Sequence, residues 1–291
     1  MKALIAQRGS HKPQFADVAG AELTDGQVRV AVAAAGFTYF DAFVSAHGAE
    51  LGLPDEVGLG FDFSGTVTEV GAEVDGIAVG DRVAGLHDDI TAPARAHAEE
   101  VVVAATAVAV VPVGLELDVA AAVTLSALTA RQSLDLLGPD RGSLLVTGAA
   151  GAIGGWLIEL AQREGWSVTS LVRPGTEGQV ASGSVITSLS GTYDAVLDAA
   201  ALHAPALAVV RDGGRYVGFK PGQPQPSERG IAISTVQVVP DGDALADLLP
   251  LAADGAVTTR IAGRSSLSDA GDAYDAAGAG TGSRGRWLLI P

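Results

Sequence analysis

The sequence contains no cysteine and no asparagine, and only three of its 291 residues are lysine. Without cysteine the chain cannot form disulfides, a thiolate nucleophile, a zinc ribbon or a cysteine-ligated iron–sulfur cluster. Long hydrophobic runs are also missing. The uncharged stretch 142–158 contains five glycines and a turn, and the apolar N-terminal run ends at Gln7, too early for a secretion signal. These absences predict a cytoplasmic protein with no membrane association.

Basic residues are scarce as well. The chain has 34 acidic and 18 basic residues, a formal net charge of −16, which repels nucleic acid and anionic membrane surfaces. Hydrophobic residues make up 48% and charged residues 18%, close to the average of globular proteins. Because 291 residues exceed one ordinary domain, we expect two domains, with one large barrel as the alternative. The expected partner is a small molecule.

The first hundred or so residues favour β-structure. Val28, Val30 and Val32 alternate with Arg29 and small residues, the period of two that places one face of a strand on a core. Further short apolar runs follow, separated by glycine, aspartate and proline turns, at 61–70, 79–86 and 101–111. This pattern predicts a small barrel or sandwich.

From about Leu117 onward the pattern alternates between strand and helix. A helix is predicted over 118–137, with Asp118 as its N-cap and Gly138-Pro139 as its end. Strands are then predicted at 143–147, 167–173, 194–198, 215–219, 231–239 and 287–290, and helices at 152–164, 243–253 and 268–277. Such alternation indicates a parallel, doubly wound sheet.

The clearest chemical signal is a glycine-rich turn between a predicted strand and a predicted helix. Its residues are Gly148, Ala149, Ala150, Gly151, Ala152, Ile153 and Gly154. Gly148 suits a sharp exit from the strand, Gly151 lets a pyrophosphate approach the backbone, and Gly154 lets the helix pack closely. The alternative is a tight turn that binds nothing. The strand–turn–helix context favours a dinucleotide site.

The end of the second strand of this unit distinguishes between cofactors. An NAD site usually places a carboxylate there to bind the ribose 2′-hydroxyl, but no acidic residue lies between Gly165 and Thr176. Arg173 offers a guanidinium suited to a 2′-phosphate, and Ser170 offers a second donor. A solvated surface arginine is the alternative interpretation. The pattern favours NADPH as cofactor.

Several segments along nearly the whole chain resemble the zinc-independent quinone oxidoreductases (zeta-crystallin-like) of the medium-chain dehydrogenase/reductase superfamily. The resembling segments are AGFTYFD at 35–41, GLGFDFSGTV at 58–67, GDRV at 80–83, LTA at 128–130, the turn at 148–154, YDAVLD at 193–198, GGRYVG at 213–218 and RGRWLL at 284–289. Each is weak singly, but their order and spacing agree. A short-chain dehydrogenase is disfavoured, because the glycine turn of that class lies near the N-terminus, whereas the turn of this chain lies at 148–154.

The resemblance implies a GroES-like β-barrel domain combined with a Rossmann doubly wound parallel sheet domain. The implied division is residues 1–115 for the first part of the GroES-like substrate domain, 116–255 for the dinucleotide-binding domain and 256–291 for the return to the first domain. A homodimer is among the assemblies that the resemblance leaves open.

The chain departs from this family in ways that affect its chemistry. Zinc-dependent relatives need cysteines and Gly-His-Glu, whereas this chain reads Gly60-Phe61-Asp62, so we expect no metal site. The family's asparagine in the first segment is Thr38 here. The segment between Arg173 and Tyr193 is also short.

The resemblance suggests a hydride transfer from NADPH to a quinone or an α,β-unsaturated carbonyl, with no metal. Tyr39 is the candidate proton or hydrogen-bond donor, with barrel packing as its alternative role, and Thr38 the candidate for orienting the cofactor or carbonyl. Thr129 resembles a residue of the nicotinamide pocket, or is an ordinary helix threonine. Lys220 and Arg284 are candidates for phosphate contacts, or surface cations.

A different class of function stays open: an NADPH-binding sensor or pseudoenzyme that regulates a protein partner. The replaced asparagine and the shortened fold favour this alternative slightly. Turnover of NADPH with a panel of acceptors distinguishes the two classes.

Overall fold

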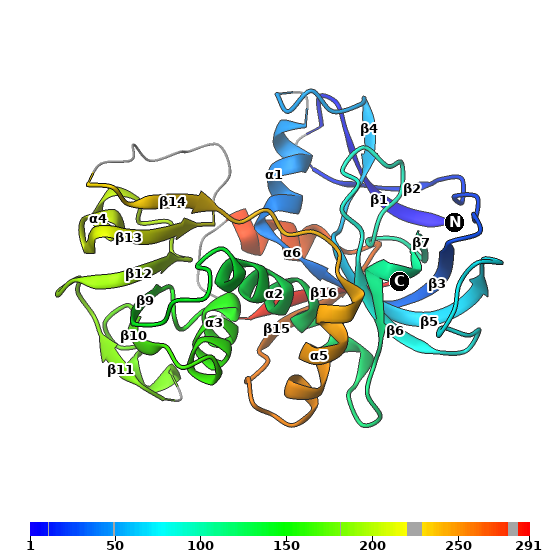
Figure 1. Ribbon diagram of the computed structural model, residues 1–291. Helices are drawn as coiled ribbons and strands as arrows, with labels where there is room; N and C mark the ends of the chain where they lie inside the picture. Colours follow the sequence, from blue (N-terminus) through cyan, green and yellow to red (C-terminus); the bar gives the residue numbers. More distant parts are fainter. Residues whose placement is uncertain (11, 49, 181, 220–228, 279–284) are drawn as a thin grey trace. The chain divides into compact units, whose positions relative to one another are not determined.

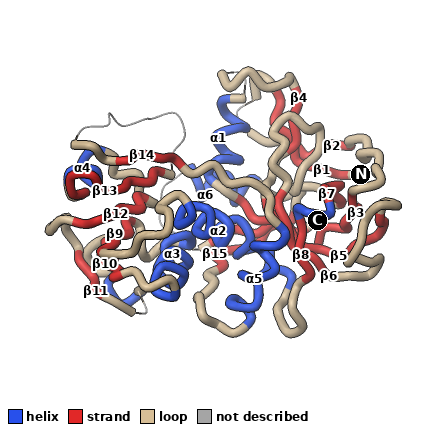
Figure 2. Tube along the Cα trace, in the orientation of Figure 1, coloured by secondary structure: helices blue, strands red, loops and turns tan. Residues whose placement is uncertain are grey.

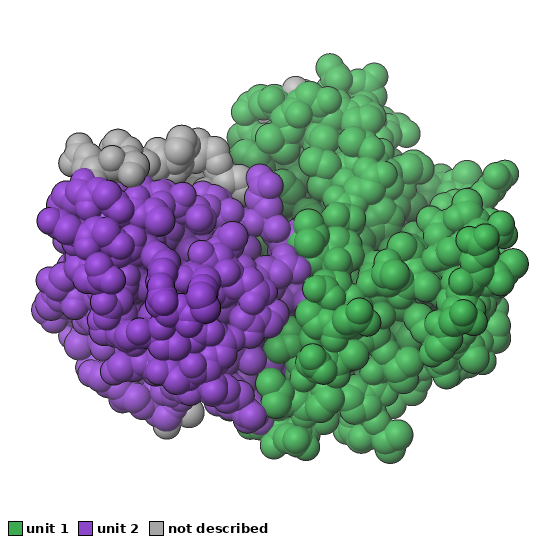
Figure 3. Space-filling view, viewed as in Figure 1, with its two compact units in different colours: residues 1–125, 239–255, 259–291 green, residues 126–238, 256–258 purple. Residues whose placement is uncertain are grey.

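The computed structural model forms two compact units (Figure 3). It describes residues 1–10, 12–48, 50–180, 182–219, 229–278 and 285–291. Unit 1 comprises residues 1–125, 239–255 and 259–291, and unit 2 comprises residues 126–238 and 256–258. The chain therefore leaves unit 1 for unit 2 and then returns to unit 1.

Unit 1 is rich in antiparallel β-structure (Figure 1). Its strands are β1 (Lys2–Gln7), β2 (Gln14–Asp17), β3 (Gln27–Phe37), β4 (Glu56–Gly58), β5 (Asp62–Val70), β6 (Arg82–Leu86), β7 (Glu100–Ala104), β8 (Val108–Val110), β15 (Ile261–Ser266) and β16 (Arg286–Ile290). One sheet has the order β2-β1-β4, and the larger one has the order β15-β16-β3-β5-β6-β8, with β7 also paired to β3. The helices of this unit are α1 (Tyr39–His47), η1 (Ala105–Ala107), α5 (Gly242–Ala253) and α6 (Gly271–Gly278).

The alternation predicted around Val28 is confirmed in β3. Val28, Val30 and Val32 are buried in one core cluster together with Phe63, while Ala31 and Ala33 between them are exposed. β3 is long enough to pair with three strands, β5, β7 and β16. This strand therefore joins the N-terminal part of unit 1 to its C-terminal return.

The C-terminal return is tied into unit 1 by a buried ion pair. Asp62 at the start of β5 is fully buried, and Arg286 of β16 donates to its Oδ1 at 2.6 Å. Burial raises the pKa of Asp62, while the positive charge of Arg286 opposes that rise. Removing only one partner would leave an uncompensated buried charge. The pair links residues 224 positions apart.

Unit 2 is a parallel sheet of six strands. Its order is β11-β10-β9-β12-β13-β14, and all of its strand pairs are parallel. The strands are β9 (Ser143–Thr147), β10 (Ser167–Leu171), β11 (Ser184–Ile186), β12 (Tyr193–Asp198), β13 (Val210–Gly218) and β14 (Ala232–Thr235); the helices are α3 (Ala152–Arg163), η2 (Glu177–Gln179) and α4 (Ala204–Ala208). The helix α3 packs on β9 and β10, and α4 on β12 and β13 (Figure 2). The predicted combination of a β-rich domain with a parallel doubly wound sheet is confirmed.

Several predicted elements have different bounds in the structure. The helix α2 (Leu117–Asp135) begins one residue before Asp118, so Asp118 lies in its first turn and is not its N-cap. The run 101–111 is two strands, β7 and β8, separated by η1, because the chain bends at Ala105. The strand predicted at 231–239 is only β14, since the chain leaves the sheet after Thr235.

The unit boundaries also fall at other residues than the predicted domain boundaries. The boundary at 125/126 lies inside α2, and α5 belongs to unit 1, where a Cβ on Gly242 would lie 2.4 Å from the carbonyl oxygen of Val108. The domain division at 115/116 and 255/256 stays a prediction. The structure places α5 in unit 1, whereas the predicted dinucleotide-binding domain, 116–255, includes it. This placement depends on tertiary contacts.

Candidate cofactor site and active-site segment

The three glycines of the turn between β9 and α3 have three different structural reasons. Gly148 has a φ of +64°, a conformation that favours glycine. Gly151 has an extended backbone (φ −82°, ψ 175°), is exposed, and forms the N-cap of α3. A Cβ on Gly154 would lie 2.4 Å from the carbonyl oxygen of Gly148 and 2.7 Å from Ala149. Gly154 is therefore required by the packing of the turn, whereas a Cβ on Gly151 would meet one atom closely, the Gly148 carbonyl oxygen at 3.1 Å.

The turn presents free backbone to a ligand at one place in particular. The N–H of Ala149 donates to the carbonyl of Leu171 at 3.3 Å, so this residue is engaged by the sheet. The N–H of Gly151 is likewise engaged, by the carbonyl of Gly148 at 2.8 Å. Ala152, by contrast, is exposed at the first turn of α3, whose N-cap has no side-chain hydrogen bond. The first N–H groups of a helix have no partner within it and carry partial positive charge, which suits a phosphate.

Beyond β10 the two predicted 2′-phosphate contacts differ in accessibility. Arg173 is exposed, and its guanidinium has no hydrogen bond or ion pair within the described part of the chain. Most other described arginines pair with a carboxylate, for example Arg163 with Glu159 at 2.6 Å. Ser170 is fully buried in β10, and its Oγ has no partner among described residues. Only Arg173 is placed to meet a surface ligand.

The carboxyl end of β12 lies beside the glycine turn and carries a buried polar network that the sequence analysis missed. Asp198 is fully buried and accepts hydrogen bonds from the hydroxyls of Thr147 at 2.6 Å and Tyr216 at 2.8 Å. The desolvation of Tyr216 raises its pKa well above its ordinary value, and its bond to Asp198 adds to the rise. The signal available in the sequence is an aspartate that ends a predicted buried strand.

The active-site candidates in unit 1 stand at the start of α1. Thr38 is the N-cap: its Oγ1 accepts from the N–H of Asp41 and donates to the Asp41 carboxylate at 2.6 Å. The Asp41 carboxylate also accepts from the N–H of Thr38 and, at 2.9 Å, from the N–H of Gly60. Tyr39, the next residue, is 72% exposed, so packing inside unit 1 does not account for it. Thr38 and Asp41 form a capping box that fixes the backbone from which Tyr39 projects.

The remaining predicted residues are less informative. Thr129 lies on α2 within unit 2 and is 7% exposed, and its carbonyl accepts from Ser133 Oγ at 2.6 Å. Lys220 and Arg284 lie outside the described residues. No group of three or more potential metal ligands occurs in the part of the chain that the structure describes. Among the described helices, none combines the length and apolar character of a membrane span.

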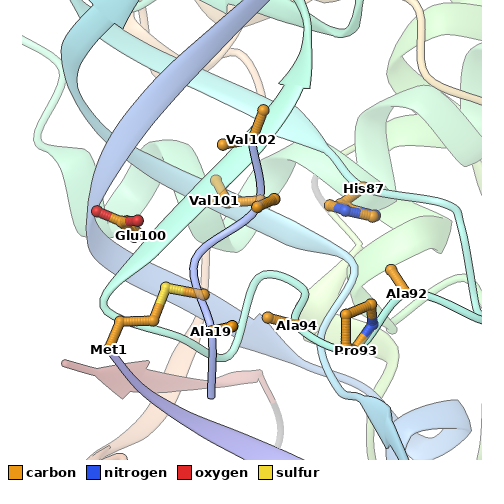
Figure 4. Close-up of a pocket in the computed structure, with 10 residues that line it drawn as sticks. Met1, Ala19, His87, Ala92, Pro93, Ala94, Glu100, Val101 and Val102 are labelled. Carbon is orange, nitrogen blue, oxygen red and sulfur yellow. The ribbon is translucent and has the colours of Figure 1, made fainter. Parts of the chain in front are cut away.

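A small pocket in unit 1 is distinct from these residues (Figure 4). It has a volume of about 70 Å³, too little for a dinucleotide. Its wall includes Met1, Ala19, Pro93, Glu100 and the imidazole of His87 (Figure 4).

His87 predicts a pH dependence of stability. Burial, helped by the positive charge of Arg95, lowers its pKa from 6.5 to about 4. Between pH 6.5 and pH 4 the His87 imidazole is therefore protonated in the unfolded chain but neutral in the folded one. The contribution of neutral His87 to the free energy of unfolding is fully present above pH 6.5 and is lost as the pH falls toward 4. The loss is at most about 3 kcal/mol.

Replacing His87 with glutamine is expected to reduce this pH-dependent loss, as measured by urea unfolding above pH 6.5 and near pH 4. The buried His97, whose pKa burial also lowers, keeps part of the dependence in the variant. Identical pH slopes for the variant and the wild type would show that His87 is not the group involved.

Comparison with known proteins adds a family model and several relatives. Residues 24–115 match the alcohol dehydrogenase GroES-like domain. The spectinabilin polyketide synthase system protein NorB of Streptomyces orinoci is 35% identical over 219 residues, 68% of this chain and 10% of that protein. A quinone oxidoreductase of Pseudomonas aeruginosa is 34% identical over 165 residues, 55% of this chain and 48% of that protein. The chain thus spans half or less of the length of these curated relatives.

Solved structures share the whole fold. A quinone oxidoreductase from Coxiella burnetii superposes with a TM-score of 0.84, covering 100% of this chain and 99% of that one, at 23% sequence identity.

Proposed function

We propose that the chain is a metal-independent oxidoreductase of the medium-chain dehydrogenase/reductase superfamily that uses NADPH to reduce a quinone or an α,β-unsaturated carbonyl. Bound NADPH would supply the hydride. The observation that carries the proposal is the glycine turn at the carboxyl end of β9 with the unpaired Arg173 beyond the next strand, β10.

The described residues fit such a cofactor. The N–H groups of the first turn of α3, from Ala152 onward, would bind the pyrophosphate. Arg173 would bind the 2′-phosphate, since a guanidinium pairs well with phosphate oxygens and an NAD site would place a carboxylate there. In a chain of net charge −16, an exposed arginine without a carboxylate partner is suited to an anionic ligand.

On the acceptor side, Tyr39 is proposed to donate a hydrogen bond or proton to the oxygen that gains negative charge. Thr38 is proposed as an orienting residue. The Thr38 hydroxyl donates its hydrogen to the Asp41 carboxylate. The contribution of Thr38 is therefore to fix the first turn of α1, which begins at Tyr39. Thr129 stays a proposed contact for the nicotinamide.

The test is turnover of NADPH with a panel of quinones and 2-alkenals, followed by the loss of NADPH absorbance. We expect oxidation with at least one acceptor class, and Tyr39→Phe should reduce the rate by roughly tenfold or more because it removes the donor while keeping the ring. EDTA should leave the rate unchanged. A metal content near one per chain, with activity lost in EDTA, would contradict the metal-independent proposal.

A second candidate is an NADPH-binding sensor. The specific observation in its favour is the engagement of the Thr38 hydroxyl by Asp41, at the position where relatives carry asparagine. Tight NADPH binding with no turnover across the panel would favour this candidate. A homodimer and a cytoplasmic location stay predictions.

A further inference from the structure

The loop that follows β12 is held in place by the buried carboxylate of Asp198. Besides the hydroxyls of Thr147 and Tyr216, this carboxylate accepts from the backbone N–H groups of Leu202 at 3.1 Å and His203 at 2.7 Å. The Thr147 hydroxyl oxygen in turn accepts from the N–H of Ala200 at 2.9 Å. Three N–H groups of residues 199–203 are thus fixed from inside the sheet.

The loop contains two non-glycine residues with positive φ. Ala201 has a φ of 52°, and His203 has a φ of 61° with a ψ of −117°. The His203 values are those of the first central residue of a type II′ turn, a position that glycine dominates. A side chain at this position costs free energy of folding that glycine would not, and such strain concentrates at functional sites. The positive φ of His203 therefore points to a function for its imidazole.

The sheet order indicates which part of a dinucleotide this loop would meet. β10 and β12 flank β9 on opposite sides (Figure 1). Arg173 follows β10, while the loop follows β12, and its Ala199 and Ala200 backbone lies 3.2–3.3 Å from the position of a Cβ on Gly148. With the pyrophosphate on the turn and the 2′-phosphate at Arg173, the nicotinamide half extends over β12.

We propose that the imidazole of His203 hydrogen-bonds the nicotinamide-ribose half of NADPH, and that Asp198 is the positioning residue that holds His203 there. The inference rests on the proposed cofactor. His203 is partly exposed, and its imidazole has no hydrogen-bond partner in the described ranges of the chain, so it is free to contact a ligand. The oxygens it would meet are the ribose hydroxyls or the adjoining phosphate.

The test compares two ligands and two readouts in His203→Gly. Removing the side chain should weaken NADPH binding by about three- to tenfold, the effect of one hydrogen bond. Relief of the positive φ should raise the melting temperature by roughly 2–4 °C. Adenosine 2′,5′-bisphosphate, which lacks the nicotinamide half, should bind as to the wild type. Affinity and stability thus move in opposite directions.

Ala201→Gly is the matched control. It relieves a positive φ in the same loop and should raise the melting temperature while leaving NADPH binding unchanged. His203→Ala keeps the unfavourable backbone and should lose NADPH affinity with no gain in stability.

Wild-type NADPH affinity in both His203 variants would overturn the inference, as would an equal loss for both ligands. A wild-type protein that binds neither ligand would overturn the proposed function, and this inference with it.

Discussion

Replacing Arg173 with alanine is expected to remove most of a preference for NADPH over NADH. We expect the wild type to bind NADPH at least about tenfold more tightly, because the guanidinium offers charge-assisted hydrogen bonds to the 2′-phosphate. The variant should lose roughly 1.5–3 kcal/mol of NADPH binding energy and leave NADH binding nearly unchanged. Fluorescence titration of each protein with both dinucleotides measures the four affinities.

Arg163→Ala is a suitable control, because it removes the same charge from the same unit. Arg163 is exposed on α3 and pairs with Glu159 rather than facing the end of β10. It should keep the NADPH preference. Equal wild-type affinities for NADPH and NADH would contradict the cofactor assignment, and an equal loss of both in Arg173→Ala would show that the arginine does not contact the 2′-phosphate.

Much of the fold follows from local patterns in the sequence. The alternation at Val28, Val30 and Val32 marks a face that must be buried, and β3 buries it. The bounds of β9 and α3 lie within one residue of the predicted ones, because glycines adjoin these elements, as at Gly148 with its φ of +64° directly after β9. The placement of α5 in unit 1 could not be predicted, since it depends on contacts with β8 that are distant in sequence.

The candidate site was predictable in part. The glycine turn and Arg173 are local features and could be found, but the accessibility of Ser170 could not, because a central parallel strand buries both of its faces. The capping box of Thr38 and Asp41 was available as a Thr-x-x-Asp pattern before an apolar run. The φ of His203 could not be predicted, because the Asp198 carboxylate that accepts from the His203 N–H is itself held by the hydroxyls of Thr147 and Tyr216 on other strands.

Gly151→Val is expected to abolish most dinucleotide binding while the protein still folds. Its extended backbone, with a φ of −82° and a ψ of 175°, suits a branched residue. A Cβ there would meet only the Gly148 carbonyl oxygen, at 3.1 Å. The valine would instead occupy the space in which a pyrophosphate must approach the N–H groups of α3. A thermal melt with and without saturating NADPH separates the two effects.

The wild type should gain about 2.7 kcal/mol of stability at a hundredfold excess of NADPH over its Kd, because the ligand binds only the folded state. Gly151→Val should melt near the wild-type temperature without ligand and gain little with it. Gly154→Ala is the contrasting control: its Cβ would collide with the turn backbone at 2.4 Å, so it should lower the melting temperature of the ligand-free protein. A valine at position 151 would keep a pyrophosphate away from the backbone of the turn. If Gly151→Val nevertheless keeps the full ligand-induced shift in melting temperature, the turn at 148–154 is not the dinucleotide site.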